Sequence, residues 1–455
     1  MKKQRNEKGI SRRAFLGGTI MGAAVLTQAC SRFHIVPRRV LGGRGYVPPS
    51  EKLNIAGIGV GGQGGGDIDG VSSQSIVALC DVDERRAADT FKRFPEARQY
   101  RDFRVMLDRE KGIDAVTVST PDHVHAAAAS AAIARGKHVF VQKPLTHSIY
   151  EARRLTEMAR EQKVATHMGI QGHAGDGMRR LAEWIGAGVV GPVREVHIWT
   201  NRPIWPQGID RPKESPEVPP ELDWDLWLGP APARPYHPCY LPFNWRGWWD
   251  FGTGALGDIG CHAMDASFWI LDLGAADTVE VEAETAPVND ETAPEWSQIT
   301  FHFPARGEKP PLRLFWYDGG KTPPVPDELK EEGRGLPGDN GVLFVGDKGK
   351  IISPELYGGG PRLIPEARMK EFDRPPETLA SSIGHYLEWI QACKGGAPAG
   401  ANFDYAGPLT ETALLGNLAV RAGEKIRWSA KKMEVTNCPK ANRYVRDAYR
   451  RGWRL

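Results

Sequence analysis

Residues 55–66 read "IAGIGVGGQGGG", an apolar run that passes directly into a series of glycines. Gly57, Gly59 and Gly62 follow the spacing G-x-G-x-x-G between a predicted strand and a predicted helix. Glycines at these positions allow a tight turn and let the main chain approach a pyrophosphate group at the helix N-terminus. The flanking strand and helix favour this interpretation over a glycine-rich turn that binds nothing. The stretch therefore predicts the start of a dinucleotide-binding fold.

An aspartate after the next strand indicates which dinucleotide fits. Asp81 follows "SIVALC", 19 residues after Gly62. A carboxylate at this place accepts hydrogen bonds from the hydroxyl groups of the adenine ribose and repels a 2′-phosphate. NAD is therefore the predicted cofactor. NADP remains an alternative because Arg85 and Arg86 follow closely and could accommodate that phosphate.

Further strands and helices continue this pattern. Apolar strands are expected near 52–60, 75–83, 113–120, 137–142 and 164–170, with helical segments at 83–94, 122–135 and 147–162 between them. Strands that alternate with helices predict a doubly wound parallel sheet, a Rossmann domain over residues 51–172. Later apolar runs, such as those near 277–286 and 296–303, follow one another without helices. They predict a second α/β domain with an open, mostly antiparallel sheet over residues 173–430.

The remaining parts of the chain are short. Residues 31–50 are rich in Pro, Gly and Arg and predict an extended arm. Residues 431–455 form a basic, aromatic tail, which either docks on a neighbouring subunit or forms a solvated helix.

The first thirty residues resemble an export signal. A basic start precedes an uncharged run that is too short to span a bilayer comfortably, and Arg12 and Arg13 match the twin-arginine signal of folded-protein export. We therefore expect a periplasmic or exported protein, with a membrane anchor only if the segment stays uncleaved. Lipidation at Cys30 is the less favoured alternative, since Gln28 fits the lipid-attachment motif poorly.

Charge and cysteine content exclude other classes of function. Residues 1–30 hold six Lys/Arg and one Glu, so the formal net charge of +3 becomes about −2 without them. Such a near-neutral chain offers no electrostatic reason to bind nucleic acid. The five later cysteines are scattered without C-x-x-C spacing, which indicates neither a disulfide framework nor a zinc site.

The turn after the third apolar strand, "STPDHVH", is expected to reach the cofactor. Ser119, Thr120 and Pro121 end that strand, and Asp122 is a plausible N-cap of the next helix. His123 and His125 resemble a metal pair, but no third ligand lies nearby in sequence, so no metal is predicted. A capping role or a place at the edge of the cofactor is expected instead, with His125 as the candidate cofactor contact.

Two further motifs carry groups that could move a proton. "KHVFVQKP" places Lys143 at the end of a strand, directly before a proline. In "GDIGCHAMD", Asp258 and His262 share one face of a predicted helix, with Asp265 one turn beyond. A carboxylate one turn from an imidazole can orient the ring and stabilise its protonated form, as a general base requires. On spacing alone, a buried polar pair would explain the second motif equally well.

The order of these motifs resembles that of the Gfo/Idh/MocA oxidoreductases, the family of glucose–fructose oxidoreductase and inositol dehydrogenase. The resemblance covers most of the chain after residue 50. It implies that Lys143, the lysine of a Glu-Lys-Pro motif, lies beside the nicotinamide and touches the reacting hydroxyl. It also implies that Asp258 and His262 are the pair of a D-x-x-x-H pattern, and that the bond before Pro144 is cis. The chain departs from the family at Gln142, which can hydrogen-bond the cofactor but cannot neutralise Lys143.

A carbohydrate substrate is expected from this resemblance and from the density of aromatic residues. Eight of the 14 tryptophans fall within residues 199–269, and aromatic rings stack on the apolar faces of sugars. For any single tryptophan a place in the core is the better interpretation. The candidate substrate contacts are Gln171, His173, Tyr236, His237, Asn244, Trp245, Arg246, Asp258 and His262.

These expectations converge on an exported NAD-dependent oxidoreductase that acts on a hydroxyl of a sugar, glycoside or polyol. Because free NAD is scarce outside the cytoplasm, the cofactor would stay tightly bound. One alternative is a redox-neutral glycosidase or lyase that oxidises C3 transiently. Another is a non-catalytic carbohydrate-binding protein that retains NAD. The resemblance also implies a homo-oligomer, a dimer or a tetramer.

Overall fold

Strand β1 (Asn54–Ile58) lies at the centre of a six-stranded sheet whose order is β3-β2-β1-β4-β5-β6. In this computed structural model, which describes residues 48–455, every strand pair of that sheet is parallel. The order is that of the Rossmann fold, as predicted. The other strands are β2 (Ser75–Cys80), β3 (Arg98–Tyr100), β4 (Ala115–Val118), β5 (His138–Val141) and β6 (Thr166–Met168).

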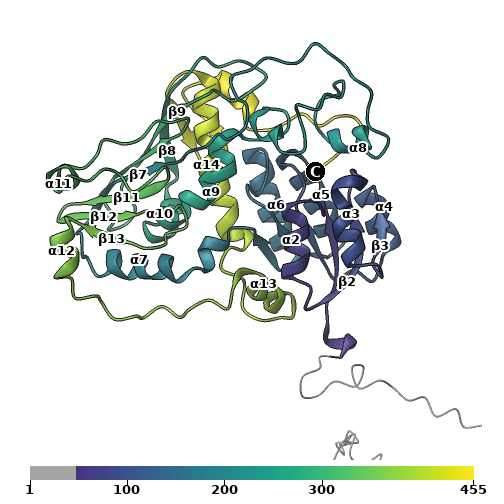
Figure 1. Cartoon of the computed structure of the whole chain (residues 1–455), viewed down its shortest axis with the longest axis horizontal. Helices are drawn as coiled ribbons and strands as arrows, with labels where there is room; N and C mark the ends of the chain where they lie inside the picture. The colour runs from purple at the N-terminus through teal and green to yellow at the C-terminus, as the bar shows by residue number, and fades with distance from the viewer. Residues whose placement is uncertain (1–47) are drawn as a thin grey trace, which may run out of the picture. The chain divides into compact units, whose positions relative to one another are not determined.

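Helices connect these strands and form two packed groups. One group contains α2 (Gln63–Gly70) and α3 (Glu84–Arg93), and the other contains α4 (Phe103–Arg109), α5 (Asp122–Ile133) and α6 (Ile149–Gln162). Figure 1 shows both groups beside the parallel sheet. Strands β1, β4 and β5 are almost entirely buried because helices cover the sheet, which explains their nearly continuous apolar sequences. Sequence analysis missed the short edge strand β3 and helix α4.

The second sheet has nine strands in the order β13-β12-β11-β7-β10-β9-β8-β14-β15. All pairs are antiparallel except β10 with β7, so the mostly antiparallel sheet is confirmed. The strands are β7 (Val193–Trp199), β8 (Thr278–Thr285), β9 (Ser297–Phe303), β10 (Leu312–Tyr317), β11 (Gly341–Gly346), β12 (Gly349–Ser353), β13 (Arg362–Ile364), β14 (Ile426–Ser429) and β15 (Glu434–Val435).

Long helices link the two sheets. Helix α14 (Phe403–Ala422) packs against α6 on one side and against α9 (Gly254–Ala263) and β8 on the other. One hydrophobic cluster runs through this region and includes Val118, Ile259 and Leu414. The remaining helices are α7 (Asp176–Gly186), α8 (Trp224–Leu228), α10 (Asp265–Ile270), α11 (Asp327–Glu331), α12 (Glu366–Lys370) and α13 (His385–Cys393). The short 3-10 helices are η1 (Pro49–Glu51), η2 (Gln171–Ala174), η3 (Asn244–Gly247), η4 (Leu273–Ala275) and η5 (Pro439–Tyr444).

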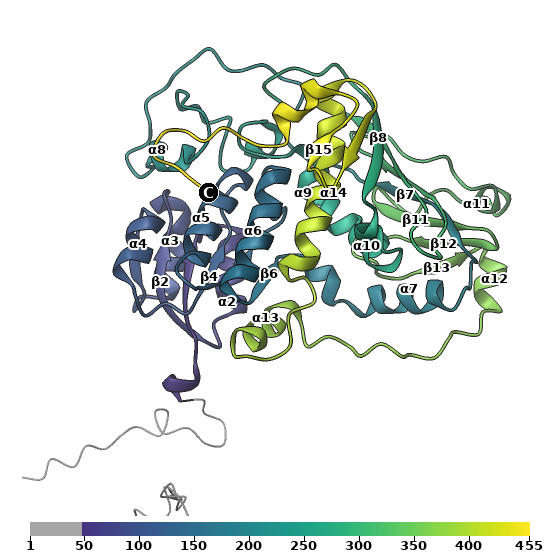
Figure 2. The same ribbon diagram turned by 180° about the vertical axis from the view of Figure 1, so that it is seen from behind.

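The basic, aromatic tail packs back on its own chain and is not a solvated helix. After η5 it crosses to the Rossmann domain, where the Tyr150 N–H donates to the Val445 carbonyl at 3.0 Å. The Arg450 N–H donates to the Pro230 carbonyl at 2.9 Å, and its side chain pairs with Asp225. Figure 2 shows this yellow segment passing to the C-terminus beside α8. The tail therefore ends close to the Rossmann domain.

The predicted signal at residues 1–30, with Cys30, and most of the predicted arm lie outside the described residues. From Cys80 onward the five cysteines are free. Among residues 48–455, no helix combines the length and apolar character that crossing a membrane would require.

Candidate functional site

A cavity of about 670 Å³ lies along the carboxyl edge of the parallel sheet. The turns after β1, β2, β4, β5 and β6 all contribute to its wall, and α9 from the second domain faces them. Ligands of open α/β sheets bind at this edge, where the strand order reverses. The position therefore fits a dinucleotide.

The glycine turn fits a pyrophosphate. Gly59 and Gly62 line the cavity with φ of 73° and 56°, backbone conformations that residues with a side chain rarely adopt. A Cβ at Gly59 would lie 2.8 Å from the Ser119 carbonyl oxygen, so nothing larger than glycine fits. Gly57 does not line the cavity. It allows close packing beneath the turn, where a Cβ would lie 2.7 Å from Ile68.

Asp81 lines the cavity beside the glycine turn, at the end we call the ribose end because the adenine ribose is predicted there, and its hydrogen bonds hold that turn in place. Its Oδ2 accepts hydrogen bonds from the N–H groups of Val60 (2.8 Å) and Gly61 (3.1 Å), and its Oδ1 accepts one from Asp83 (3.0 Å). Burial raises the pKa of Asp81, although these N–H groups oppose the change. A carboxylate has about four acceptor positions, so one remains for a ribose hydroxyl.

Gln142 hydrogen-bonds a carboxylate that the predicted site did not include. Its Nε2 donates to both oxygens of Asp67 on α2, each at 3.0 Å. Asp67 is fully buried and also accepts hydrogen bonds from Ser119 (2.6 Å), Gln63 (3.0 Å) and Tyr386 (2.7 Å). A glutamate at 142 would place two carboxylates in contact. The family motif has a carboxylate at position 142. In this protein the carboxylate is that of Asp67, and Gln142 is its hydrogen-bond partner.

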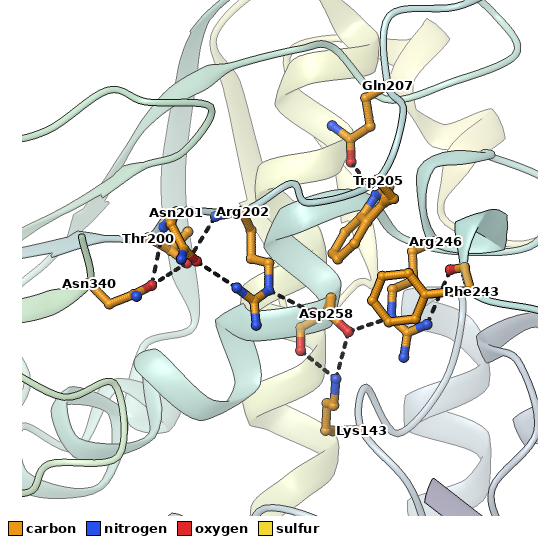
Figure 3. Close-up of polar contacts among 10 residues, drawn as sticks. All are labelled: Lys143, Thr200, Asn201, Arg202, Trp205, Gln207, Phe243, Arg246, Asp258 and Asn340. Carbon is orange, nitrogen blue, oxygen red and sulfur yellow. Dashed lines mark hydrogen bonds and ion pairs between the residues drawn. The ribbon is translucent and has the colours of Figure 1, made fainter. Parts of the chain in front are cut away.

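Lys143 is held by Asp258 at the far end of the cavity. Its Nζ donates to Oδ1 and to the main-chain carbonyl oxygen of Asp258, both at 2.7 Å. The same Oδ1 accepts a hydrogen bond from Arg246 Nε at 2.8 Å, and Arg202 Nε lies 3.8 Å from Oδ2. Figure 3 shows the three cationic side chains around this carboxylate. Burial alone would raise the pKa of Asp258, but Lys143 and Arg246 hold it well below its usual range.

His262 lines the same cavity, but its expected hydrogen bond to Asp258 is not present. The Asp258 carboxylate faces the cations, and among the described residues no partner bonds Nδ1 of the buried His262 ring. Burial, together with the nearby Lys143 ammonium, lowers the pKa of His262 to about 3. The imidazole is therefore neutral near pH 7. Its edge contact with the Tyr357 ring, at 5.0 Å between centroids, fixes its orientation.

The other predicted residues divide into two groups. Ser119, Thr120, Pro121, Gln142, Gln171, Trp245 and Arg246 line the cavity. His125, His173, Tyr236, His237 and Asn244 are not among its lining residues, which corrects the expectation for each of them. The peptide bond between Lys143 and Pro144 is cis, as the resemblance implied.

Specific partners explain why two of these histidines are not available to a ligand. The ring nitrogens of His125 lie 2.8 Å from the Thr120 and Pro144 carbonyl oxygens. The ring therefore links the turn after β4 to the turn after β5. His173 bonds Asp265 at 2.9 Å, away from the cavity. Tyr236 packs edge-on against Trp224, which in turn stacks on the cavity-lining Trp227.

Among the cavity-lining residues that sequence reasoning missed are Arg202, Tyr357, Tyr386 and Trp453. Each lies on an irregular segment or at the start of a helix far along the chain, and none belongs to a motif. Trp453 comes from the tail, with its ring 5.9 Å from that of Phe103 and beneath the Arg104 guanidinium. Among the described residues, no group of three His, Cys, Asp or Glu side chains is arranged to hold a metal.

Comparison with known proteins agrees with this geometry. Residues 53–170 match the family model of the Gfo/Idh/MocA oxidoreductase family's NAD-binding Rossmann fold, and residues 199–308 match its C-terminal alpha/beta domain. A levoglucosan dehydrogenase of Pseudarthrobacter phenanthrenivorans is 24% identical over 193 residues, 42% of each chain. A glycosyl hydrolase family 109 protein of Shewanella pealeana is 31% identical over 172 residues, 33% of this chain and 37% of that protein. The chain thus spans less than half of the length of these curated relatives.

A solved structure shows the same fold. The WlbA dehydrogenase from Bordetella pertussis, in complex with NADH and UDP-GlcNAcA, has a TM-score of 0.57 and 17% sequence identity. The match covers 83% of this chain and 99% of that chain. Together the two domain matches cover about half of the chain, in the order in which the two sheets occur. The chain belongs to the Gfo/Idh/MocA oxidoreductase family, and its first domain is an NAD-binding Rossmann domain.

Proposed function

We propose that this protein is an exported NAD-dependent oxidoreductase that oxidises a hydroxyl group of a sugar, glycoside or polyol. The observation that carries the proposal is that one cavity is lined by Gly59 and Gly62, by Lys143 and by His262. The nucleotide turn and the candidate proton-transfer groups thus face a shared space. The relative named as a levoglucosan dehydrogenase supports a carbohydrate substrate.

The side chains suggest a division of roles at the reacting hydroxyl. Neutral His262 has an unoccupied ring nitrogen that can accept the hydroxyl proton. The Lys143 ammonium can polarise the substrate oxygen, while Asp258 fixes its position from the opposite domain. When bound, the dinucleotide accepts the hydride that leaves the carbon. Asp258 therefore acts on Lys143, and the role first expected for it, orienting His262, is not retained.

The twin arginines support export, and export supports a tightly held cofactor. A protein folded before export can take up its dinucleotide in the cytoplasm, where NAD is abundant, and then retain it. Assembly as a homo-oligomer is the remaining part of the proposal, which size-exclusion chromatography of the purified protein tests directly.

The central experiment uses protein purified from the exported fraction. We expect NAD(H) to co-purify, and a panel of sugars and polyols to change the absorbance of reduced nicotinamide. His262→Ala should abolish the absorbance change while the dinucleotide stays bound. Full activity of that variant would refute the role of His262.

A redox-neutral glycosidase is the second candidate, because one relative is named as a glycosyl hydrolase family 109 protein. The same assay separates the two functions. Cleavage of a glycoside with no net change in reduced nicotinamide would favour the second. Tight sugar binding with neither cleavage nor absorbance change would indicate a non-catalytic binding protein.

A further inference from the structure

Three cations and one carboxylate lie close together at the end of the cavity lined by Lys143 and His262. We call this the substrate end. Lys143, Arg202 and Arg246 surround Asp258, and all four line the wall (Figure 3). His262 is neutral near pH 7 because burial lowers its pKa to about 3. Asp122 also lines the wall, but its carboxylate accepts a hydrogen bond from Thr253, and burial raises its pKa. Even with Asp122 ionised, the cluster keeps a net positive charge.

The acidic groups elsewhere on the wall do not neutralise this cluster. Asp81 is bonded to the glycine turn, and Asp83 and Asp102 cap helices α3 and α4 at the ribose end. Arg86 and Arg101 line that same end. Within residues 48–455, the positive charge at the substrate end therefore has no other acidic counterpart on the cavity wall.

Two guanidinium groups have donors to spare. Arg246 gives one N–H to Asp258 and one to the Phe243 carbonyl oxygen, which leaves three of its five N–H groups without a partner among the described residues. Arg202 gives one N–H to Asn201, and its buried Nε has no hydrogen-bond partner within that same region. That Nε faces Asp258 Oδ2 at 3.8 Å, whereas the second N–H of Nη1 and both N–H groups of Nη2 have no partner among the described residues and can serve an acceptor in the cavity.

The arginines are held in place rather than loose. The Arg246 guanidinium lies 4.3 Å from the ring centroids of both Phe243 and Trp245. Asn201, which binds Arg202, is itself bonded through its main-chain N–H to Asn340 at 3.1 Å. A fixed guanidinium fork matches the planar oxygens of a carboxylate and can bind them in pairs. Fixing donors in advance reduces the entropy cost of binding.

We propose that the substrate of this cavity carries a carboxylate: it is an acidic sugar, such as a uronate, whose carboxylate binds Arg202 with Arg246 as the second donor. Its reacting hydroxyl then faces Lys143 and His262, a part that rests on the proposed function. A neutral sugar offers hydroxyl groups to these arginines but no charge to balance the cluster. The inference thus names the substrate class from the charge of the site.

Binding tests the inference without turnover. Protein with its dinucleotide bound is titrated calorimetrically with glucuronate and with glucose, which differ only in whether C6 is a carboxylate. A charge-assisted bidentate contact predicts on the order of tenfold to hundredfold tighter binding of glucuronate. Galacturonate and galactose form a second matched pair, in case the first has the wrong stereochemistry. Equal affinity within both pairs would overturn the proposal.

Variants identify the group responsible. Arg202→Gln should lower the affinity for the acid by about tenfold more than it lowers the affinity for the neutral sugar. Arg202→Lys keeps the charge without the fork, and it should retain part of the preference. Arg194→Gln is the matched control, since Arg194 is exposed on β7 and pairs with Asp347. An unchanged preference in Arg202→Gln, with the variant folded by circular dichroism, would contradict the assignment.

The outcomes also separate this inference from the proposed function. Acid-selective binding without any change in reduced nicotinamide would support the carboxylate site and refute the oxidoreductase. Oxidation of neutral sugars, with no selectivity for acids, would support the oxidoreductase and refute the carboxylate site.

Discussion

The ammonium of Lys143 lies 2.7 Å from the carboxylate and 2.7 Å from the main-chain carbonyl oxygen of Asp258. Lys143, at the carboxyl edge of the Rossmann sheet, is thus hydrogen-bonded to helix α9 of the second domain. Arg246 shares the same carboxylate. Asp258 is therefore the counter-charge of the site, and it also ties the two domains together where the substrate would bind.

Asp258→Asn should destabilise the protein. It removes the negative partner of a buried ion pair and leaves Lys143 and Arg246 facing each other, so we expect the free energy of unfolding to fall by about 3 kcal/mol. Urea denaturation measures this change. Asp347→Asn removes an exposed partner, that of Arg194, and should have no measurable effect. A stable Asp258→Asn protein would show that the cations tolerate one another.

The pH profile should reveal the state of His262. Its pKa of about 3 lies below the ordinary value, so the proton-accepting form is present above that pH and is lost only as the pH falls through it. We expect kcat/KM for substrate oxidation to show no inflection from His262 between pH 5 and pH 8. An inflection near pH 6.5 that disappears in His262→Ala would contradict this prediction.

Placing a second carboxylate at one contact tests why glutamine occupies position 142. Gln142→Glu places a carboxylate against Asp67, and two carboxylates in contact cannot easily both ionise. We expect NAD affinity to fall about tenfold at pH 8. Adding Asp67→Asn restores one carboxylate and one amide in exchanged positions and should recover most of the affinity. If the double variant binds NAD as weakly as the single one, the pairing is not the reason for glutamine.

The tail should slow cofactor release. Trp453 lines the cavity beside Phe103, so Trp453→Ala removes part of the wall at the ribose end. Loss of one well-packed aromatic contact predicts about tenfold faster dissociation of NADH, measured by stopped-flow displacement. Trp453→Phe should restore slow release, whereas Arg454→Ala, an exposed neighbour, should resemble the unmodified protein. Unchanged release from Trp453→Ala would exclude the tail from cofactor retention.

Docking of the tail should weaken in alkaline solution. Burial opposes a charge on His147, but Asp447, 2.7 Å away, raises the pKa of His147 to about 9. Because this pKa is raised by folding, the stabilisation is full below about pH 6.5 and is lost as the pH rises to about 9. We expect the free energy of unfolding to fall by about 3 kcal/mol over that range. Asp447→Asn should flatten the slope, and an equal slope in both proteins would refute the pairing.

The fold could be predicted from sequence because its signals are local. The glycines at 57, 59 and 62 require a turn between strand and helix, and the alternation of strands and helices specifies a parallel sheet. Asp81 and Lys143 were found for the same reason, since each ends a strand and strand ends meet at one edge of the sheet.

The substrate end could be predicted only in part. Helical spacing correctly placed Asp258 and His262 on one wall of the cavity, but spacing does not tell which neighbour a carboxylate will bind. The Asp258 carboxylate pairs with Lys143 and Arg246, which are charged, and not with the neutral ring of His262. His125 and His173 were misassigned because main-chain carbonyl groups and Asp265 occupy them. Arg202 reaches the site from an irregular segment whose path depends on long-range packing, so no local pattern reveals it.

The wall of the cavity includes residues from Ile58 to Trp453. During synthesis on the ribosome, the glycine turn emerges hundreds of residues before the tryptophan that completes the enclosure. A dinucleotide that bound to the nascent Rossmann domain would occupy a cavity that still lacks Trp453 in its wall at the ribose end. If the chain is exported with its cofactor, as we propose, we expect firm binding of the dinucleotide to follow translation and to precede contact with the translocation machinery.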